Sequence, residues 1–258
     1  MARRLSPATR LGLPLAAAAA ALAAWAVAVE ATGTAVFPSP LEVAAGIGEL
    51  ARRGVLGAYV ADSLRRVAIG YLLALAVGVP AGLLFGFSPL AARIAEPVIQ
   101  LLRPISPLAW IPVAIVLFGI TDAAAVFLIF LASVFPIAVA TMTGVHGVPE
   151  MMLRAGRNFG LSPLGLALRV VVPAALPQVL AGLRIALGIA WLVVVAAEMI
   201  AVSSGLGYLV IDARNAGQRY DLVVAAMLMI GVIGLALDLL ARRVERLRPV
   251  RWGFARES

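Results

Sequence analysis

Long stretches without a charged residue alternate with short polar stretches along the chain. The charge-free stretches cover residues 11–29, 67–92, 104–121 and 123–149, and two further apolar regions lie near 170–211 and 222–237. A helix that crosses the hydrocarbon core of a bilayer needs about 20 mostly apolar residues. We therefore expect an all-α, polytopic membrane protein with about six transmembrane helices, at residues 11–29, 67–88, 97–119, 123–145, 176–202 and 221–241. These spans use the whole chain, 1–258, and predict one transmembrane domain.

Composition supports a membrane protein and excludes several classes of function. Apolar residues make up 63% and charged residues 13% of the 258 residues, and the mean hydropathy is +1.04. Soluble domains carry roughly 45–50% apolar and about 25% charged residues, so the chain has too little polar surface for a water-soluble enzyme. The net charge of +8 does not indicate nucleic-acid binding in so apolar a chain. With no cysteine and a single histidine, His146, we expect neither a disulfide nor a metal site.

All 21 basic residues are arginines, and their distribution predicts the orientation in the membrane. Basic residues are enriched in cytoplasmic loops. Most arginines fall on the side that carries both chain ends, namely Arg3, Arg4, Arg10, Arg93, Arg154, Arg157, Arg169, Arg242, Arg243, Arg246, Arg248, Arg251 and Arg256. Both termini are therefore expected in the cytoplasm, although segment 52–66 places four arginines on the other side. A cleaved signal peptide is the alternative for the first span.

Segment 30–66 is too polar to span the membrane. Leu41, Ala44, Ala45 and Gly48 alternate there with charged residues, which predicts one or two amphipathic helices on the outer face. Such helices would either dock an external partner or lie at the lipid interface.

Two patterns within the spans predict how the helices pack. Small residues recur every fourth position at Gly70, Ala74, Gly78, Gly82 and Gly86, and again at Gly182, Ala186 and Ala190. This spacing lets another helix backbone approach closely, either as ordinary packing or as an interface that moves. Residues 103–112 contain three prolines, which lack a backbone donor. We expect a broken, cavity-lining segment there.

The stretch 149–163 is the polar loop with the clearest pattern. Pro149 and Glu150 suit a helix start, while Gly160 and the following Ser-Pro pair suit a helix end. Within the helix, Met152, Ala155, Gly156 and Phe159 fall at i, i+3, i+4 and i+7 and form one apolar stripe. The periodicity leaves two readings open: a helix that docks a cytoplasmic partner, or one that rests on the lipid surface.

This loop resembles the coupling loop of permease subunits of bacterial ABC importers. The family motif is Glu-Ala-Ala, three residues, Gly, nine residues, then Ile-x-Leu-Pro. Here Arg154, Ala155 and Gly156 are followed by Gly160, and nine residues later by Val170, Val171, Val172 and Pro173. The glycine-to-proline spacing matches, while Arg154 replaces the motif's Glu. The resemblance implies a cytoplasmic coupling loop at 146–173, in which Arg154, Ala155, Gly156, Phe159, Gly160 and Pro173 couple the chain to an ATPase.

Other segments resemble the branch that serves sulfonates, taurine and nitrate. They are Phe-Pro-Ser-Pro at 37–40, Ser-Leu-Arg-Arg at 63–66, Leu-Arg-Pro-Ile-Ser-Pro at 102–107, Gly-Leu-Arg-Ile-Ala-Leu-Gly at 182–188, the run 191–199 that ends in Ala-Glu-Met, and Ser-Gly-Leu-Gly-Tyr at 204–208. The resemblance thus extends from residue 37 to residue 208.

The resemblance implies a type I ABC importer permease fold in the bacterial inner membrane. It implies four kinds of partner: a second permease copy in a homodimer, two ATP-binding cassette ATPase subunits, a periplasmic or lipid-anchored substrate-binding protein, and the membrane lipids around the permease. The chain contains no lysine, so it lacks a phosphate-binding loop of the Gly-rich Lys-Ser/Thr type. ATP is therefore expected to bind a partner subunit, and we expect no catalytic residue and no cofactor in this chain.

The expected function is import of a small solute by ATP-driven alternating access, and the branch implies an aliphatic sulfonate, taurine or a nitrate-like anion. Ionisable groups inside spans are costly and are candidates for the substrate path. We take Arg103, Arg184, Trp110 and Glu198 as candidates, with helix bridging or packing as the alternative for each. Glu198 would repel an anion, which favours a structural or gating role. A different cargo, such as a pyrimidine precursor, and a non-transport membrane scaffold are the competing functions.

Overall fold

The computed structural model describes residues 7–33, 37–215 and 217–245, and this part of the chain is helical without a β-strand. The elements in chain order are α1 (Pro7–Thr32), α2 (Pro40–Arg52), α3 (Val55–Phe87), α4 (Pro89–Leu102), the 3₁₀-helix η1 (Pro107–Trp110), α5 (Ile111–Phe118), α6 (Asp122–His146), α7 (Glu150–Asn158), α8 (Pro163–Leu166), the π-helix η2 (Ala167–Val171), α9 (Val172–Ala201), α10 (Leu206–Asn215) and α11 (Tyr220–Glu245). Several arginines of the orientation argument lie outside the described residues: Arg3, Arg4, Arg246, Arg248, Arg251 and Arg256.

Within the described residues, five helical stretches are long and apolar enough to cross a membrane, and a bent pair of helices raises the number to six. The prediction of an all-α protein with about six transmembrane helices is thereby confirmed. The span expected at 97–119 is formed by α4 together with the η1–α5 segment, which are bent by 83° at a short break, so the broken segment predicted at 103–112 is present. Pro104 and Pro107 lie at the break, where each removes a backbone donor and disfavours a helical residue before it.

The second long helix starts twelve residues earlier than the hydropathy pattern indicates. α3 begins at Val55, so only α2 remains of the surface helices expected over 30–66. The first turns of α3 carry Ser63 and Arg66, which are polar but buried. A hydropathy pattern assigns polar residues to a surface, because it contains no information on the hydrogen-bond partners that bury them inside the bundle.

α2 packs on the bundle through residues outside the apolar set named from the sequence, whose member Leu41 stays exposed. A capping box starts it: Glu42 donates its backbone N–H to Ser39 Oγ at 3.3 Å, and Ser39 donates its own to Glu42 Oε2 at 2.7 Å. The buried residues are Val43, Gly46 and Leu50, whereas Leu41 is 82% exposed. The helix therefore has a bundle-facing side and a free side.

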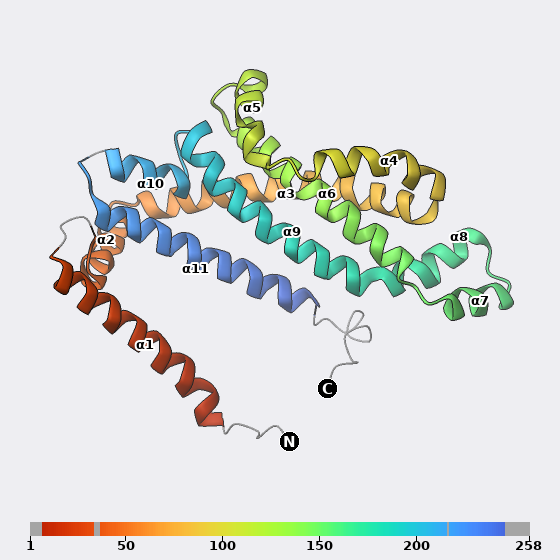
Figure 1. The fold of residues 1–258 in the computed structure, drawn as a ribbon, viewed down its shortest axis with the longest axis horizontal. Helices are drawn as coiled ribbons and strands as arrows, with labels where there is room; N and C mark the ends of the chain where they lie inside the picture. Colours follow the sequence, from red (N-terminus) through yellow and green to blue (C-terminus); the bar gives the residue numbers. More distant parts are fainter. Residues whose placement is uncertain (1–6, 34–36, 216, 246–258) are drawn as a thin grey trace.

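α6 lies at the centre of the bundle, with α3 along one side and α9 along the other (Figure 1). The small-residue ridge of α3 meets α6: a Cβ on Gly70 would lie 2.7 Å from Ile129 Cβ, and one on Gly78 would lie 2.8 Å from Ile137 Cγ2. On α9, a Cβ on Gly182 would overlap the side chain of Ala140. Both small-residue patterns therefore serve close packing against the same central helix.

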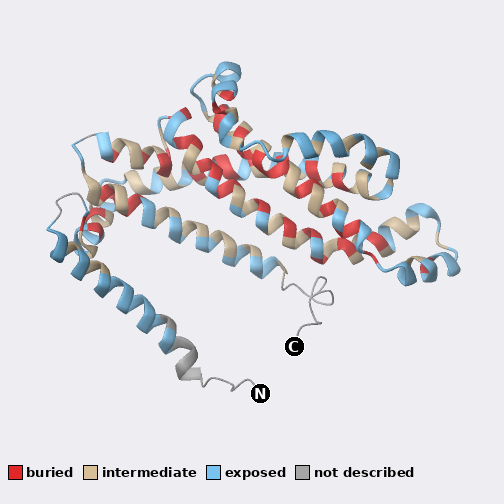
Figure 2. Ribbon diagram, in the orientation of Figure 1, coloured by how far each residue is buried: buried red, intermediate tan, exposed pale blue. Residues whose placement is uncertain are grey.

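The outer helices contribute much less to the core. Figure 2 shows buried residues concentrated on α3, α6 and α9, while α1 is exposed along most of its length. α11 joins the bundle through Leu222, Ala225 and Ala226, and Trp191 on α9 donates its indole N–H to the Ile230 carbonyl at 3.0 Å. The apolar side chains that remain exposed on α1 are a surface suited to lipid or to another protein.

Figure 1 shows two distinct ends of the bundle. α7 and α8 form one, which we call the loop end. α2, α10 and the first turns of α3, α6 and α11 form the other, which we call the α2–α10 end.

Candidate functional site

At the loop end, residues 146–173 form a short helix followed by a tight return. α7 begins after Pro149, and Arg154 Nε contacts Glu150 Oε1 at 3.3 Å one turn later. Gly160 ends it with φ +73°, a left-handed conformation that side chains with a Cβ rarely adopt, and Leu161 donates its N–H to the Gly156 carbonyl at 3.2 Å. The short helix predicted to start at Pro149 and Glu150 is therefore present as Glu150–Asn158, and Gly160 follows its end as expected.

The two faces of α7 have different neighbours. Gly156 is buried, and a Cβ there would lie 3.4 Å from Val170 Cγ2 and collide with Leu166. Phe159 is 87% exposed, Met151 is 80% exposed, and Ala155 is also exposed. The expected stripe is therefore divided: Gly156 packs the helix against the rest of the loop, while Ala155 and Phe159 are exposed and Met152 is 40% exposed.

The return to the bundle passes through the π-helix η2. Val172 donates its N–H to the carbonyl of Ala167, five residues earlier, and Pro173 follows without an N–H of its own. Wide turns of this kind often occur at functional sites.

The loop end contains a cavity of about 590 Å³, which is lined by residues of α3, α6, α7 and α8 that include His146, Glu150 and Arg157. A second cavity, of about 660 Å³, lies at the other end of the molecule.

The four candidates for a substrate path lie in three different settings. Arg103 and Trp110 line one cavity of about 340 Å³ at the break between α4 and η1, opposite Phe135 on α6 and Ile185 on α9. Arg184 bridges α9 to α11, with Nη1 3.2 Å from Glu245 Oε2 and Nε 3.9 Å from Asp238 Oδ1. Glu198 is fully buried and is not among the lining residues of the cavities of about 660 and 590 Å³ or of the two cavities of about 340 Å³.

Glu198 belongs to a buried polar cluster at the α2–α10 end. Arg66 Nη1 donates to Glu198 Oε1 at 2.7 Å, and Ser63 Oγ donates to Glu198 Oε2 at 2.9 Å. The side chain of Arg66 is 2% exposed and that of Glu198 is 0% exposed. The backbone N–H of Gly207 donates to Glu198 Oε2 at 3.0 Å. Each oxygen of this carboxylate is thus satisfied by a donor from another element.

Arg66 extends the cluster to α6 and to the turn before α10. Its Nε lies 2.8 Å from Asp122 Oδ1, and its Nη1 also donates to the Ser204 carbonyl at 2.8 Å. The Leu206 N–H donates to Ser63 Oγ at 3.0 Å. A charged group in a membrane bundle is costly unless it is paired, and this cluster pairs it while joining α3, α6, α9 and α10.

Sequence reasoning missed Arg66 as a buried partner of Glu198, although one signal was present. Arg66 lies four residues before Gly70, so it shares the helix face of the small-residue ridge. A residue on a face that packs against another helix is expected to be buried. The partner, 132 residues away in the chain, could not be read from that pattern.

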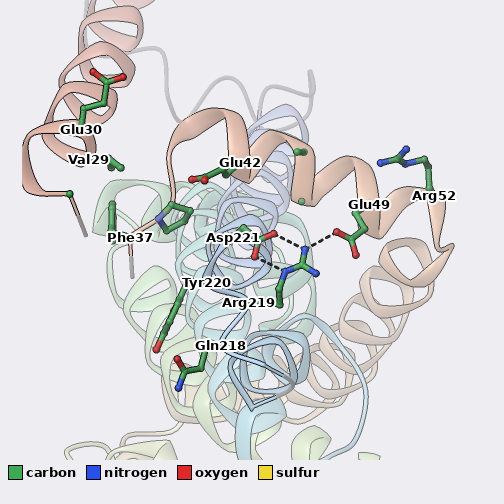
Figure 3. Close-up of a pocket in the computed structure, with 14 residues that line it drawn as sticks. Val29, Glu30, Phe37, Glu42, Glu49, Arg52, Gln218, Arg219, Tyr220 and Asp221 are labelled. Carbon is green, nitrogen blue, oxygen red and sulfur yellow. Dashed lines mark hydrogen bonds and ion pairs between the residues drawn. The ribbon is translucent and has the colours of Figure 1, made fainter. Parts of the chain in front are cut away.

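The α2–α10 end also carries the cavity of about 660 Å³ shown in Figure 3. It lies between the end of α1, the length of α2 and the start of α11. Arg219 lines this cavity and donates hydrogen bonds to Glu49 Oε2 and to Asp221 Oδ2, both at 2.7 Å. Charged residues of both signs line it: Glu30, Glu42, Glu49, Arg52, Arg219 and Asp221.

This Glu49–Arg219 contact predicts a small pH dependence of stability. The hydrogen bond from Arg219 holds the pKa of the Glu49 carboxyl below its ordinary value of 4.5. A carboxyl whose pKa is lowered on folding stabilises the protein above its unfolded pKa, and that contribution is lost as the pH falls through the folded pKa. The melting temperatures of the native protein and of Glu49→Gln should therefore differ above about pH 5 and converge in more acidic buffer. If the melting temperatures of the two proteins differ by the same amount above about pH 5 and in more acidic buffer, the expectation is contradicted.

Comparison with known proteins identifies the family. Residues 70–248 match the family described as binding-protein-dependent transport system inner membrane component. The chain is 40% identical over 246 residues to a probable ABC transporter permease protein of Brucella melitensis, covering 95% of this chain and 98% of that protein. It is 40% identical over 194 residues to the nitrate import permease protein NrtB of Synechococcus elongatus, covering 74% and 70% of the two chains. It is 37% identical over 190 residues to the taurine transport system permease protein TauC of Escherichia coli, covering 73% and 68%.

The fold is similar to that of a solved transporter. An inward-facing structure of the methionine ABC transporter MetNI matches with a TM-score of 0.65 at 18% sequence identity, covering 74% of this chain and 95% of that chain. The family match covers well over half of the chain, and a 40% identical relative matches nearly end to end. The chain therefore belongs to the family of inner-membrane components of binding-protein-dependent transport systems, as a multi-pass permease subunit of an ABC importer.

Proposed function

We propose that this permease moves a small anion, of the sulfonate, taurine or nitrate type, from the periplasm to the cytoplasm. The nitrate and taurine permeases among its relatives support an anionic cargo. In this proposal the loop end and both chain termini face the cytoplasm. The α2–α10 end faces the periplasm, where the substrate-binding protein docks. A second copy of the chain completes the pathway, and lipid covers the apolar surface that remains.

The exposed apolar face of α7 is the observation that carries the coupling part of the proposal. Phe159 and Met151 are almost fully exposed on a helix outside the bundle, and such side chains are depleted on surfaces that only meet water. An ATPase groove that receives Phe159 and Ala155 would bury them. Arg154, whose side chain is 75% exposed, lies beside this face and is available to a carboxylate of the partner.

The remaining residues of the coupling loop have supporting roles in this proposal. Gly156 lets α7 sit against Leu166, and Gly160 allows the turn that ends the helix. Pro173 opens α9, the helix that runs from the loop to Glu198. A displacement of α7 by the ATPase would therefore reach the α2–α10 end through one continuous helix. Such a movement between two packings is how domain gating operates.

Phe159→Asp is expected to abolish stable association with the ATPase subunit. A carboxylate that must enter an apolar groove without a partner costs several kcal/mol, and truncation of a central aromatic anchor alone costs about 2 kcal/mol or more. The measurement is co-purification of the cognate ATPase with the detergent-solubilised permease, followed by taurine and nitrate uptake in proteoliposomes.

Leu41→Asp is the matched control, because Leu41 is 82% exposed but lies on α2 at the opposite end of the bundle. It should leave ATPase association unchanged. Native yield of ATPase with the Phe159→Asp chain would refute the role of α7, and absence of any ATPase with the native chain would refute the importer assembly.

A further inference from the structure

The two arginines expected along the substrate path differ in their partners. Arg184 lies between Glu245 and Asp238, so its charge is neutralised by two carboxylates of α11. Arg103 makes no ion pair and no side-chain hydrogen bond within the described part of the chain. Arg103 is exposed in the single chain. In a membrane protein an unpaired guanidinium is costly unless it faces water or an anion, and this distinguishes Arg103 from Arg184.

Arg103 stands where two cavities meet. The first, about 340 Å³, is the cavity at the helix break that it shares with Trp110. The second has the same volume, lies between α4 and α6, and extends past Met142 to His146 at the loop end. No residue other than Arg103 lines both.

Both cavities follow a single face of α6. The lining residues Leu131, Phe135, Val139, Met142 and His146 recur every three or four positions, which places them on one side of the helix. Fifteen residues of helix extend about 22 Å. The two cavities together therefore follow α6 from near its middle to its loop end, with Arg103 at their junction.

The lining of the first cavity is chemically simple. Arg103 is its only charged residue, and the others are apolar or aromatic. Glu96 also lines the second cavity, where it accepts a hydrogen bond from Gln100 at 2.9 Å, and His146 is the remaining titratable group of that lining. A guanidinium in such surroundings attracts a small oxyanion, to which it donates two parallel hydrogen bonds, and repels a cation.

We infer that Arg103 is the anion-selecting residue of this permease and that the cavities beside it hold the transported anion. The inference rests on the proposed anion import, which it deepens by assigning the selecting charge to Arg103 rather than to Arg184.

The absence of cysteine from the chain allows a test that does not depend on the cargo. Ile185→Cys places a single thiol on the wall of the first cavity, at a residue that is 60% exposed. The full importer in proteoliposomes is treated with anionic sulfonatoethyl methanethiosulfonate or with the cationic trimethylammonium-ethyl reagent, and labelling of this chain is followed by mass spectrometry.

With Arg103 present, the anionic reagent should react faster, since a fixed charge in a low-dielectric cavity concentrates its counter-ion about tenfold or more. Arg103→Gln should lower the ratio of anionic to cationic rates by about that factor, and Arg103→Lys should largely retain it. The matched control is Arg93→Gln, also on α4 but lining neither cavity, which should leave the ratio unchanged.

Uptake of taurine and nitrate supplies the second measurement. Arg103→Gln should reduce initial uptake at least tenfold, while ATPase co-purification stays native. An unchanged rate ratio, or a thiol that neither reagent reaches, would overturn the role of Arg103. Loss of the ratio in Arg103→Gln together with native uptake would also overturn it. Failure of the native complex to take up either anion would instead count against the proposed function, and the labelling ratio would still report on the cavity.

Discussion

Glu198→Ala is expected to lower the free energy of unfolding by about 3–5 kcal/mol, because it leaves the buried charge of Arg66 without its main partner. The carboxylate accepts hydrogen bonds from Arg66, Ser63 and Gly207, so its removal leaves three donors unsatisfied. Asp122 still pairs with Arg66, but it is 44% exposed and also contacts Arg65. It therefore compensates only in part.

Thermal unfolding of the detergent-solubilised protein, followed by tryptophan fluorescence, measures this effect. Glu96→Ala is the matched control, since Glu96 is an exposed carboxylate with one hydrogen bond on α4, and we expect a change within about 0.5 kcal/mol. The paired replacement Arg66→Met with Glu198→Leu should be less harmful than Glu198→Ala alone, because no charge is left buried. If Glu198→Ala melts within a degree of the native protein, the cluster does not stabilise the α2–α10 end.

Gly70→Val is expected to prevent native packing of α3 against α6. A Cβ there would lie 2.7 Å from Ile129 Cβ and 2.9 Å from the Val126 carbonyl oxygen, so the two helices must separate. Overpacking of this kind typically costs about 1–3 kcal/mol and occasionally more. Here the ridge continues at Gly78, Gly82 and Gly86, so a separation at Gly70 also weakens the contacts further along.

Gly57→Val provides the comparison within the same helix. No heavy atom lies within 4 Å of a Cβ at Gly57, so the substitution should be tolerated. We expect a lower melting temperature and a smaller monodisperse fraction in size-exclusion chromatography for Gly70→Val, with native behaviour for Gly57→Val. Equal behaviour of the two variants would contradict the assignment of the ridge to close helix packing.

The sequence by itself determined those features that depend on neighbouring residues. The apolar stretches predicted the long helices, the prolines of 103–112 predicted a broken segment, and the glycine spacing predicted close packing on α3. The helix at 150–158 and its stop at Gly160 followed from local signals, because capping and glycine turns are set within a few residues. The family resemblance followed from these local motifs as well.

Only the tertiary structure decided which of these residues meet. The structure decided the 83° angle of the break that the prolines predicted, and it showed that α3 begins at Val55 because its polar Ser63 and Arg66 are buried in the bundle. Gly156 proved to face its own loop while Phe159 faces outward. The structure also distinguished two arginines that look alike in sequence, since Arg184 pairs with two carboxylates and Arg103 makes no ion pair among the described residues. Pairing across 61 or 132 residues depends on how the helices pack, and hydrophobic periodicity records which face of a helix is buried but not what that face contacts.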